Sequence, residues 1–108
     1  MATTYKVLGQ SNPAATTATT LYTVPASTQA VVSTIVIANL AAAATFRIAC
    51  RVAGATLANS QYVAYDITVG ASDSTALTLG VTLGAADVIT VYGSTATLTF
   101  TAFGSEIA

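Results

Sequence analysis

The sequence contains no histidine and no tryptophan, and it has a single cysteine, Cys50. Without histidine there is no Ser-His-Asp triad, no Cys-His dyad and no imidazole metal site. One cysteine excludes a disulfide within the chain. Because Cys50 alternates with Phe46, Ile48 and Val52, we expect a buried and inert thiol. These absences remove the residue types that most hydrolases and metal enzymes need.

Charged residues are also scarce: Lys, Arg, Asp and Glu make up 6% of the 108 residues, where about 25% is typical of soluble domains. With a net charge of −1, the sequence does not indicate a basic surface that would bind nucleic acid or an anionic membrane. The acids are scattered over different predicted elements, at Asp66, Asp73, Asp87 and Glu106. A glycosidase needs two carboxylates in one cleft, and calcium usually needs several acids close in sequence. We therefore predict no catalytic, cofactor-binding or metal-binding residue, no cofactor and no enzymatic activity; a calcium site in a loop is the alternative.

One long apolar run, "AVVSTIVIANLAAAATFRIAC" at residues 30–50, raises the question of a membrane helix. Its large apolar side chains contribute roughly −3 kcal/mol to insertion, whereas Arg47 alone costs about +3 kcal/mol near the centre. The first half is β-branched almost throughout, which suits a strand better than a helix. The second half, "TFRIACRV", alternates with a period of two. The run therefore predicts two strands joined by "NLAAAA".

The same alternation recurs along the chain, separated by turn residues such as Gly, Asn, Asp, Ser and Pro. The predicted strands are Thr4–Leu8, Thr20–Val24, Gln29–Asn39, Thr45–Val52, Gln61–Val69, Thr75–Thr82, Asp87–Tyr92 and Thr95–Phe103. We expect one all-β domain over residues 1–108, an antiparallel β-sandwich of the jelly-roll or Greek-key type with about eight strands and almost no helix. Residues 10–19, rich in Ala and Thr without alternation, are a candidate extended arm.

The alternation also predicts the core. Strand 29–39 is apolar on both faces, so it should be central or covered on its second face. Its core-facing set is either Val32, Thr34 and Val36 or Val31, Ile35 and Ile37. The core residues expected elsewhere are Phe46, Ile48, Val52, Val63, Tyr65, Ile67, Val69, Leu77, Leu79, Val81, Val88, Leu98 and Phe100.

The surface should be nearly free of charge. The outward strand faces consist of Thr, Ser, Ala and Gln, and "STATLTFTAF" places Thr95, Thr97, Thr99 and Thr101 on one side of a strand. Such a surface has weak charge repulsion and poorly protected strand edges. Proteins tolerate it when the surface is buried against copies or a partner. We therefore expect self-association, with a trimer favoured, and an assembly component instead of a freely diffusing enzyme.

Four blocks of the sequence, in their order along the chain, resemble a family of small virion structural proteins of tailed bacteriophages that is common among cyanophages. The blocks are "LYTVPASTQAVVSTIVIAN", "FRIACRVAGATLANSQYVAYD", "LTLGVTL" and "ADVITVYGSTATLTFTAFGSEI". The resemblance extends from Tyr5 to Ile107. It implies a β-sandwich with a structural role in the particle, and it supplies no catalytic residue.

From these observations we expect a non-enzymatic virion protein, with a capsid decoration (cement) subunit as the first choice. A neck, baseplate or tail-fibre component is the alternative, as is a module that binds a host surface through loops such as 53–59 and 70–74. The expected partners are copies of the chain and another virion protein, the major capsid protein first. We expect no nucleic acid, membrane or small-molecule substrate.

Overall fold

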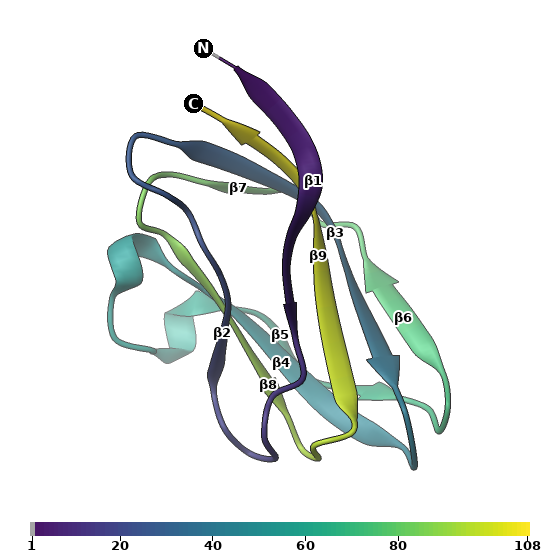
Figure 1. Ribbon diagram of the computed structural model, residues 1–108. Helices are drawn as coiled ribbons and strands as arrows, with labels where there is room; N and C mark the ends of the chain where they lie inside the picture. Colours follow the sequence, from purple (N-terminus) through teal and green to yellow (C-terminus); the bar gives the residue numbers. More distant parts are fainter. Residues whose placement is uncertain (1) are drawn as a thin grey trace.

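The computed structural model describes residues 2–108, which form nine strands in two packed antiparallel sheets (Figure 1). The strands are β1 (Thr3–Ser11), β2 (Thr19–Thr23), β3 (Gln29–Asn39), β4 (Ala44–Arg51), β5 (Tyr62–Val69), β6 (Ser74–Leu77), β7 (Val81–Leu83), β8 (Val88–Gly93) and β9 (Leu98–Ile107). The helical content of residues 2–108 is two single 3₁₀ turns, Val52–Gly54 and Asn59–Gln61. The predicted all-β sandwich is confirmed.

Strands from the start of the chain pair with strands from its end, and the strands between them pair with each other. One sheet, sheet A, has the order β1-β9-β3-β6, with β7 also paired to β3, and the other, sheet B, has the order β2-β8-β4-β5. Thus the first strand pairs with the last, β2 with β8, β3 with β6 and β7, and β4 with β5. This is the pairing of a long hairpin folded over into two sheets, which defines a jelly roll.

The apolar run at residues 30–50 crosses from one sheet to the other. Its first part is β3 at the centre of sheet A, and its second part is β4 at the centre of sheet B. The predicted bounds Gln29–Asn39 agree with those of β3. Within residues 2–108, no helix has the length and apolar character needed to cross a membrane.

The core lies between the two sheets, and β3 changes phase within it. Val32, Ile35 and Ile37 are buried, so neither of the two alternating sets predicted for this strand is right as a whole. The cause is a bulge at Ser33, where the pairing with β9 shifts between Val32 and Thr34. One extra residue moves every later side chain to the opposite face.

The prediction of a single strand at 75–82 is wrong, because two short strands occupy this segment and the break between them lies beside the bulge of β3. β6 ends at Leu77, and β7 begins at Val81. Between them Gly80 has φ of +63°, a left-handed conformation that breaks the strand beside the bulge of β3. Both short strands therefore pair with the same partner.

Five predicted core positions lie on the surface: Val52, Val63, Tyr65, Ile67 and Leu79. Val52 follows the end of β4, and Leu79 lies in the break between β6 and β7. The other three belong to β5, whose register against β4 shifts twice, between Phe46 and Ile48 and between Ile48 and Ala49. These bulges interrupt the simple alternation, and they leave Ala64 and Val69 as the buried residues of β5.

The other predicted core residues are buried or partly buried. Phe46 and Phe100 are fully buried and contact edge to face, with ring centroids 6.1 Å apart. Such pairs add about 0.5–1.5 kcal/mol to the effect of area burial alone. Buried residues that the patterning did not single out are Leu21, Tyr22, Val24, Ala30, Ala44, Ala49, Ala64, Leu83, Ile89, Val91 and Ala102.

Segment 10–19 runs from the end of β1 to the start of β2. Pro13 is buried, and Asn12 donates its side-chain amide to the carbonyls of Ala96 and Leu98. Ala15 bridges Gly93 in parallel, so this segment lies along the β8–β9 connection. Both ends of the described chain lie together at one end of the sandwich, where Ala2 and Ala108 exchange two backbone hydrogen bonds (Figure 1).

Candidate functional site

The outer side of sheet A is one candidate surface, which we call the neutral face. It is defined by outward residues of β1, β9 and β3: Tyr5, Val7, Val31, Val36, Thr99, Thr101 and Phe103. Thr99 and Thr101 alternate with buried Leu98, Phe100 and Ala102, so they face outward. The predicted threonine row is therefore present on β9 at these two positions.

The neutral face contains a shallow hollow of about 660 Å³. Tyr5 is 83% exposed, and Val7 and Phe103 also lie open beside it. The floor includes Gly104, at which an added Cβ would lie 2.0 Å from the carbonyl oxygen of Val31. Glycine is therefore required there for β9 to approach β3.

Charge is nearly absent from sheet A. β3, β6 and β7 contain no charged residue, and the two charged residues of the sheet, Lys6 and Glu106, form an ion pair of 2.8 Å. Tyr22, from the opposite sheet, donates its hydroxyl to the same carboxylate. The hydrogen bonds from Lys6 and Tyr22 lower the pKa of Glu106. Burial, reinforced by Glu106, raises the pKa of Tyr22.

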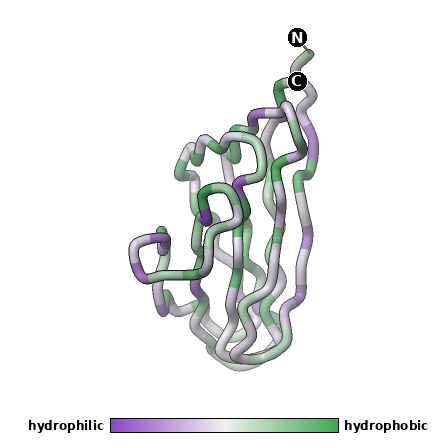
Figure 2. Tube along the Cα trace, turned by 90° about the vertical axis from the view of Figure 1, so that its left-hand side faces the viewer, coloured by the Kyte–Doolittle hydropathy of each residue, from purple (hydrophilic) through white to green (hydrophobic). Residues whose placement is uncertain are grey.

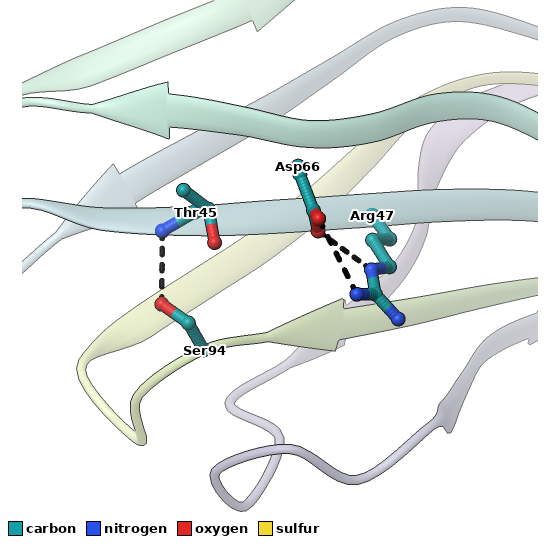
Figure 3. A network of polar contacts seen from close by, with 4 residues as sticks. All are labelled: Thr45, Arg47, Asp66 and Ser94. Atoms are coloured by element: carbon teal, nitrogen blue, oxygen red, sulfur yellow. Dashed lines mark hydrogen bonds and ion pairs between the residues drawn. The ribbon is translucent and has the colours of Figure 1, made fainter.

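The outer side of sheet B has a different character, and we call it the aromatic face: Arg47, Tyr62, Tyr65, Asp66 and Tyr92. Arg47 is on β4, between β8 and β5, and its guanidinium carbon lies 4.3 Å from the ring centroid of Tyr92 and 4.2 Å from that of Tyr65. Its Nε donates to Asp66 Oδ1 at 2.6 Å and its Nη2 donates to Asp66 Oδ2 at 3.4 Å (Figure 3). The Asp66 carboxylate raises the pKa of the guanidinium, which stays fully charged.

A bulge in β5 creates this arrangement. Tyr65 and Asp66 together lie opposite the single residue Arg47, because the pairing of β4 with β5 shifts between Phe46 and Ile48. Asp66 has φ of +52°, a conformation that costs a non-glycine residue of order 1 kcal/mol and that Asp tolerates better than most. The bulge therefore presents an aromatic ring and a carboxylate to one arginine.

The aromatic face continues into a second hollow, of about 410 Å³, lined by Asn59, Tyr62 and Tyr65. The rings of Tyr62 and Tyr65 contact edge to face, with centroids 5.0 Å apart. The β4–β5 connection, which contributes Asn59 to this hollow, projects from the molecule and has several hydrophilic positions (Figure 2). Arg51 anchors this connection by donating to the carbonyls of Ala55 and Gly54.

The remaining residues that sequence reasoning weighed for chemistry are engaged in local structure. Asp73 Oδ1 accepts from the Ser74 backbone, and Asp87 accepts from the backbones of Ala53 and Gly84. Cys50 is half-buried, and burial, with the nearby charge of Asp87, raises the pKa of its thiol. In the part of the chain that the structure describes, no three His, Cys, Asp or Glu side chains are grouped to hold a metal ion.

Sequence reasoning did not find the aromatic face. Period-two alternation places Tyr65 in the core, and it places Arg47 only on the side of its strand opposite Phe46 and Ile48. The available signal was Asp66, a poor strand former inside an otherwise apolar strand, which is typical of a bulge.

Comparison with known proteins gives no match among protein-family models, curated proteins or solved structures. The strand order alone defines the class of the protein, a jelly-roll β-sandwich, with a neutral face on one sheet and an aromatic face on the other.

Proposed function

We propose that this protein is a non-enzymatic structural subunit of a tailed-bacteriophage virion, and first of all a capsid decoration (cement) subunit. The observation that carries the proposal is the neutral face, a strand surface whose two charged residues are paired with each other and whose side chains Tyr5, Val7 and Phe103 are exposed. The resemblance of the sequence blocks to small virion proteins supports it. The jelly roll agrees with it, because capsid domains use this fold, although the fold alone decides no function.

The size of the neutral face suits repeated contacts. The face spans the three strands β1, β9 and β3, and three strands spaced about 4.8 Å apart over roughly 30 Å give about 430 Å². A standard interface takes about 800 Å² from each partner, so one such contact is weak alone. Repetition over a lattice, or combination within an oligomer, raises the total binding without any new kind of contact. This is the mechanism of a cement subunit, which adds buried area across the joints of a shell.

Self-association is part of the proposal, with a trimer favoured. A trimer would offer three neutral faces to one shell site, which increases the effective concentration of the second and third contacts. Because few charges are available for screening, binding should depend only weakly on salt. Sedimentation that detects only monomer at high concentration, together with absence from the particle, would contradict this part.

The test has two arms. Quantitative mass spectrometry of purified virions of the encoding phage gives the copy number relative to the major capsid protein. Purified Val36→Lys protein is then compared with wild type in rebinding to particles that lack the subunit. Val36 faces outward between buried Ile35 and Ile37, so the variant should fold. Burying the ammonium of the new lysine in the contact with the shell should weaken rebinding by at least about tenfold. Thr68→Lys, an exposed position on sheet B, is the matched control and should rebind like wild type.

The outcomes separate the candidates. A copy number near that of the major capsid protein supports the cement role, and a few dozen copies or fewer indicates the neck, baseplate or fibre. Absence from the particle overturns the virion proposal. If folded Val36→Lys protein rebinds as well as wild type, the neutral face is not the contact surface.

A further inference from the structure

We propose that the aromatic face is a binding site for a neutral oligosaccharide. The juxtaposition that carries the proposal is the set of tyrosines gathered around the Arg47–Asp66 pair beside the hollow at Asn59, Tyr62 and Tyr65. The site is on the sheet opposite the neutral face, and the proposal holds whether or not the neutral face docks on a shell.

The rings supply the apolar half of such a site. A pyranose ring presents a face of C–H groups that packs on an aromatic ring, and tyrosine offers a rigid ring with a hydroxyl at its end. Three of the five tyrosines of the chain are on this side, Tyr62, Tyr65 and Tyr92. Tyr65 remains 55% exposed although Arg47 lies against it, which is a large open area for an aromatic side chain in a strand.

The polar groups supply the other half. Adjacent hydroxyls on a sugar need a donor and an acceptor held a short distance apart. Arg47 and Asp66 present such a pair, because Arg47 keeps further N–H donors and Asp66 keeps acceptor capacity after their mutual bonds. Asn59 adds an exposed side-chain amide at the edge of the hollow.

The charge of the site decides the class of sugar. Arg47 is neutralised by Asp66, so the aromatic face carries no net charge from this pair. An acidic ligand would have to displace the Asp66 carboxylate from the guanidinium, and a basic ligand would meet Arg47 nearby. A neutral hexose or N-acetylhexosamine chain meets neither obstacle.

The backbone gives independent support. The left-handed conformation of Asp66 is strained, and such strain is concentrated at functional sites, where bulges redirect side chains. A regular β5 would present Tyr65 or Asp66 opposite Arg47, but not both. The bulge is what brings the ring and the carboxylate together.

The experiment titrates the full chain with neutral hexasaccharides of glucose, mannose and N-acetylglucosamine, with hyaluronate as the acidic comparison. Calorimetry and tyrosine chemical shifts are the readouts. We expect at least one neutral hexasaccharide to bind with a dissociation constant of roughly 0.1–1 mM, as suits a few stacking contacts on an open surface. Added salt should change this affinity little, because the ligand is uncharged.

Two variants test the position of the site. Tyr65→Ala and Tyr62→Ala should each weaken binding by roughly tenfold, the effect of losing one ring contact. Tyr62→Ala leaves the two rings that contact Arg47, which keeps the test valid if Tyr65→Ala loosens β5. Tyr5→Ala removes an even more exposed tyrosine from the opposite sheet and should leave binding unchanged.

Three results would overturn the proposal. The first is no binding of any neutral hexasaccharide up to about 10 mM. The second is binding that Tyr62→Ala and Tyr65→Ala leave intact while circular dichroism shows both variants folded. The third is stronger binding of hyaluronate with steep salt dependence, which would mark an anion site instead.

Discussion

Asn39, at the end of β3, should be the most sensitive polar position of the fold. It is 4% exposed. Its Nδ2 donates to the carbonyls of Ala42, Val69 and Gly70 at 2.8, 3.3 and 3.1 Å, and its Oδ1 accepts from the Ala41 backbone and the Thr97 hydroxyl at 3.2 and 3.0 Å. One side chain thus joins three connections at the same end of the sandwich.

The cost of Asn39→Ala follows from these bonds. Each bond contributes about 0.5–1.5 kcal/mol net, and a buried group left without a partner costs about 1–3 kcal/mol. The bond to the Val69 carbonyl is buried, whereas the other acceptors are partly buried and can recover water. We therefore expect a loss of about 3 kcal/mol, which lowers Tm by roughly 10–20 °C for a domain of this size.

Urea unfolding followed by circular dichroism and tyrosine fluorescence measures this loss, since the chain has no tryptophan. Asn59→Ala, at an exposed position, is the control and should change stability by less than about 0.5 kcal/mol. Asn39→Asp should lower the free energy of unfolding at pH 7 by at least as much as Asn39→Ala, because a carboxylate would face the three carbonyls that accept from Asn39 Nδ2. A loss below about 1 kcal/mol for Asn39→Ala would show that these bonds contribute little to the stability of the fold.

Three further predictions concern the sheets. Lys6 lowers the pKa of Glu106, so the stability due to this carboxylate is present above its unfolded pKa of about 4.3 and is lost as the pH falls through its lower folded pKa. In urea unfolding, the free energy of unfolding should therefore differ less between pH 3 and pH 6 for Glu106→Gln than for wild type. Gly104→Ala should destabilise by about 2–3 kcal/mol, because the new Cβ would lie 2.0 Å from the Val31 carbonyl oxygen, and unchanged thermal unfolding would contradict that close approach. Ile35→Lys should unfold the monomer in circular dichroism, since Ile35 is 1% exposed, and a folded variant would show that the phase of β3 after its bulge is wrong.

The strands could be predicted from the sequence because their signals are local. β-branched residues and turn residues gave β3 its bounds, and the alternation of Phe46 with Ile48 placed both in the core. The bulges could not be predicted in this way. Whether Ser33 is an extra residue in β3 depends on its pairing with β9, which is some 70 residues away in sequence.

The same limit applies to the candidate surfaces. The scarcity of charge predicted a neutral surface, but only the sheet order places it on sheet A and brings Lys6 to Glu106. The aromatic face was missed because the bulge at Asp66 turns Tyr65 outward, against the alternation of its strand. Non-local pairing, and not residue type, decides both features.

The proposed docking of sheet A on the capsid is tested most directly by a reconstruction of the mature virion at a resolution that orients this domain. We expect density for the jelly roll at regular sites on the outside of the shell, with sheet A toward the capsid and the aromatic face toward solvent. Density with sheet B against the shell, or no density for this protein anywhere on the particle, would contradict it.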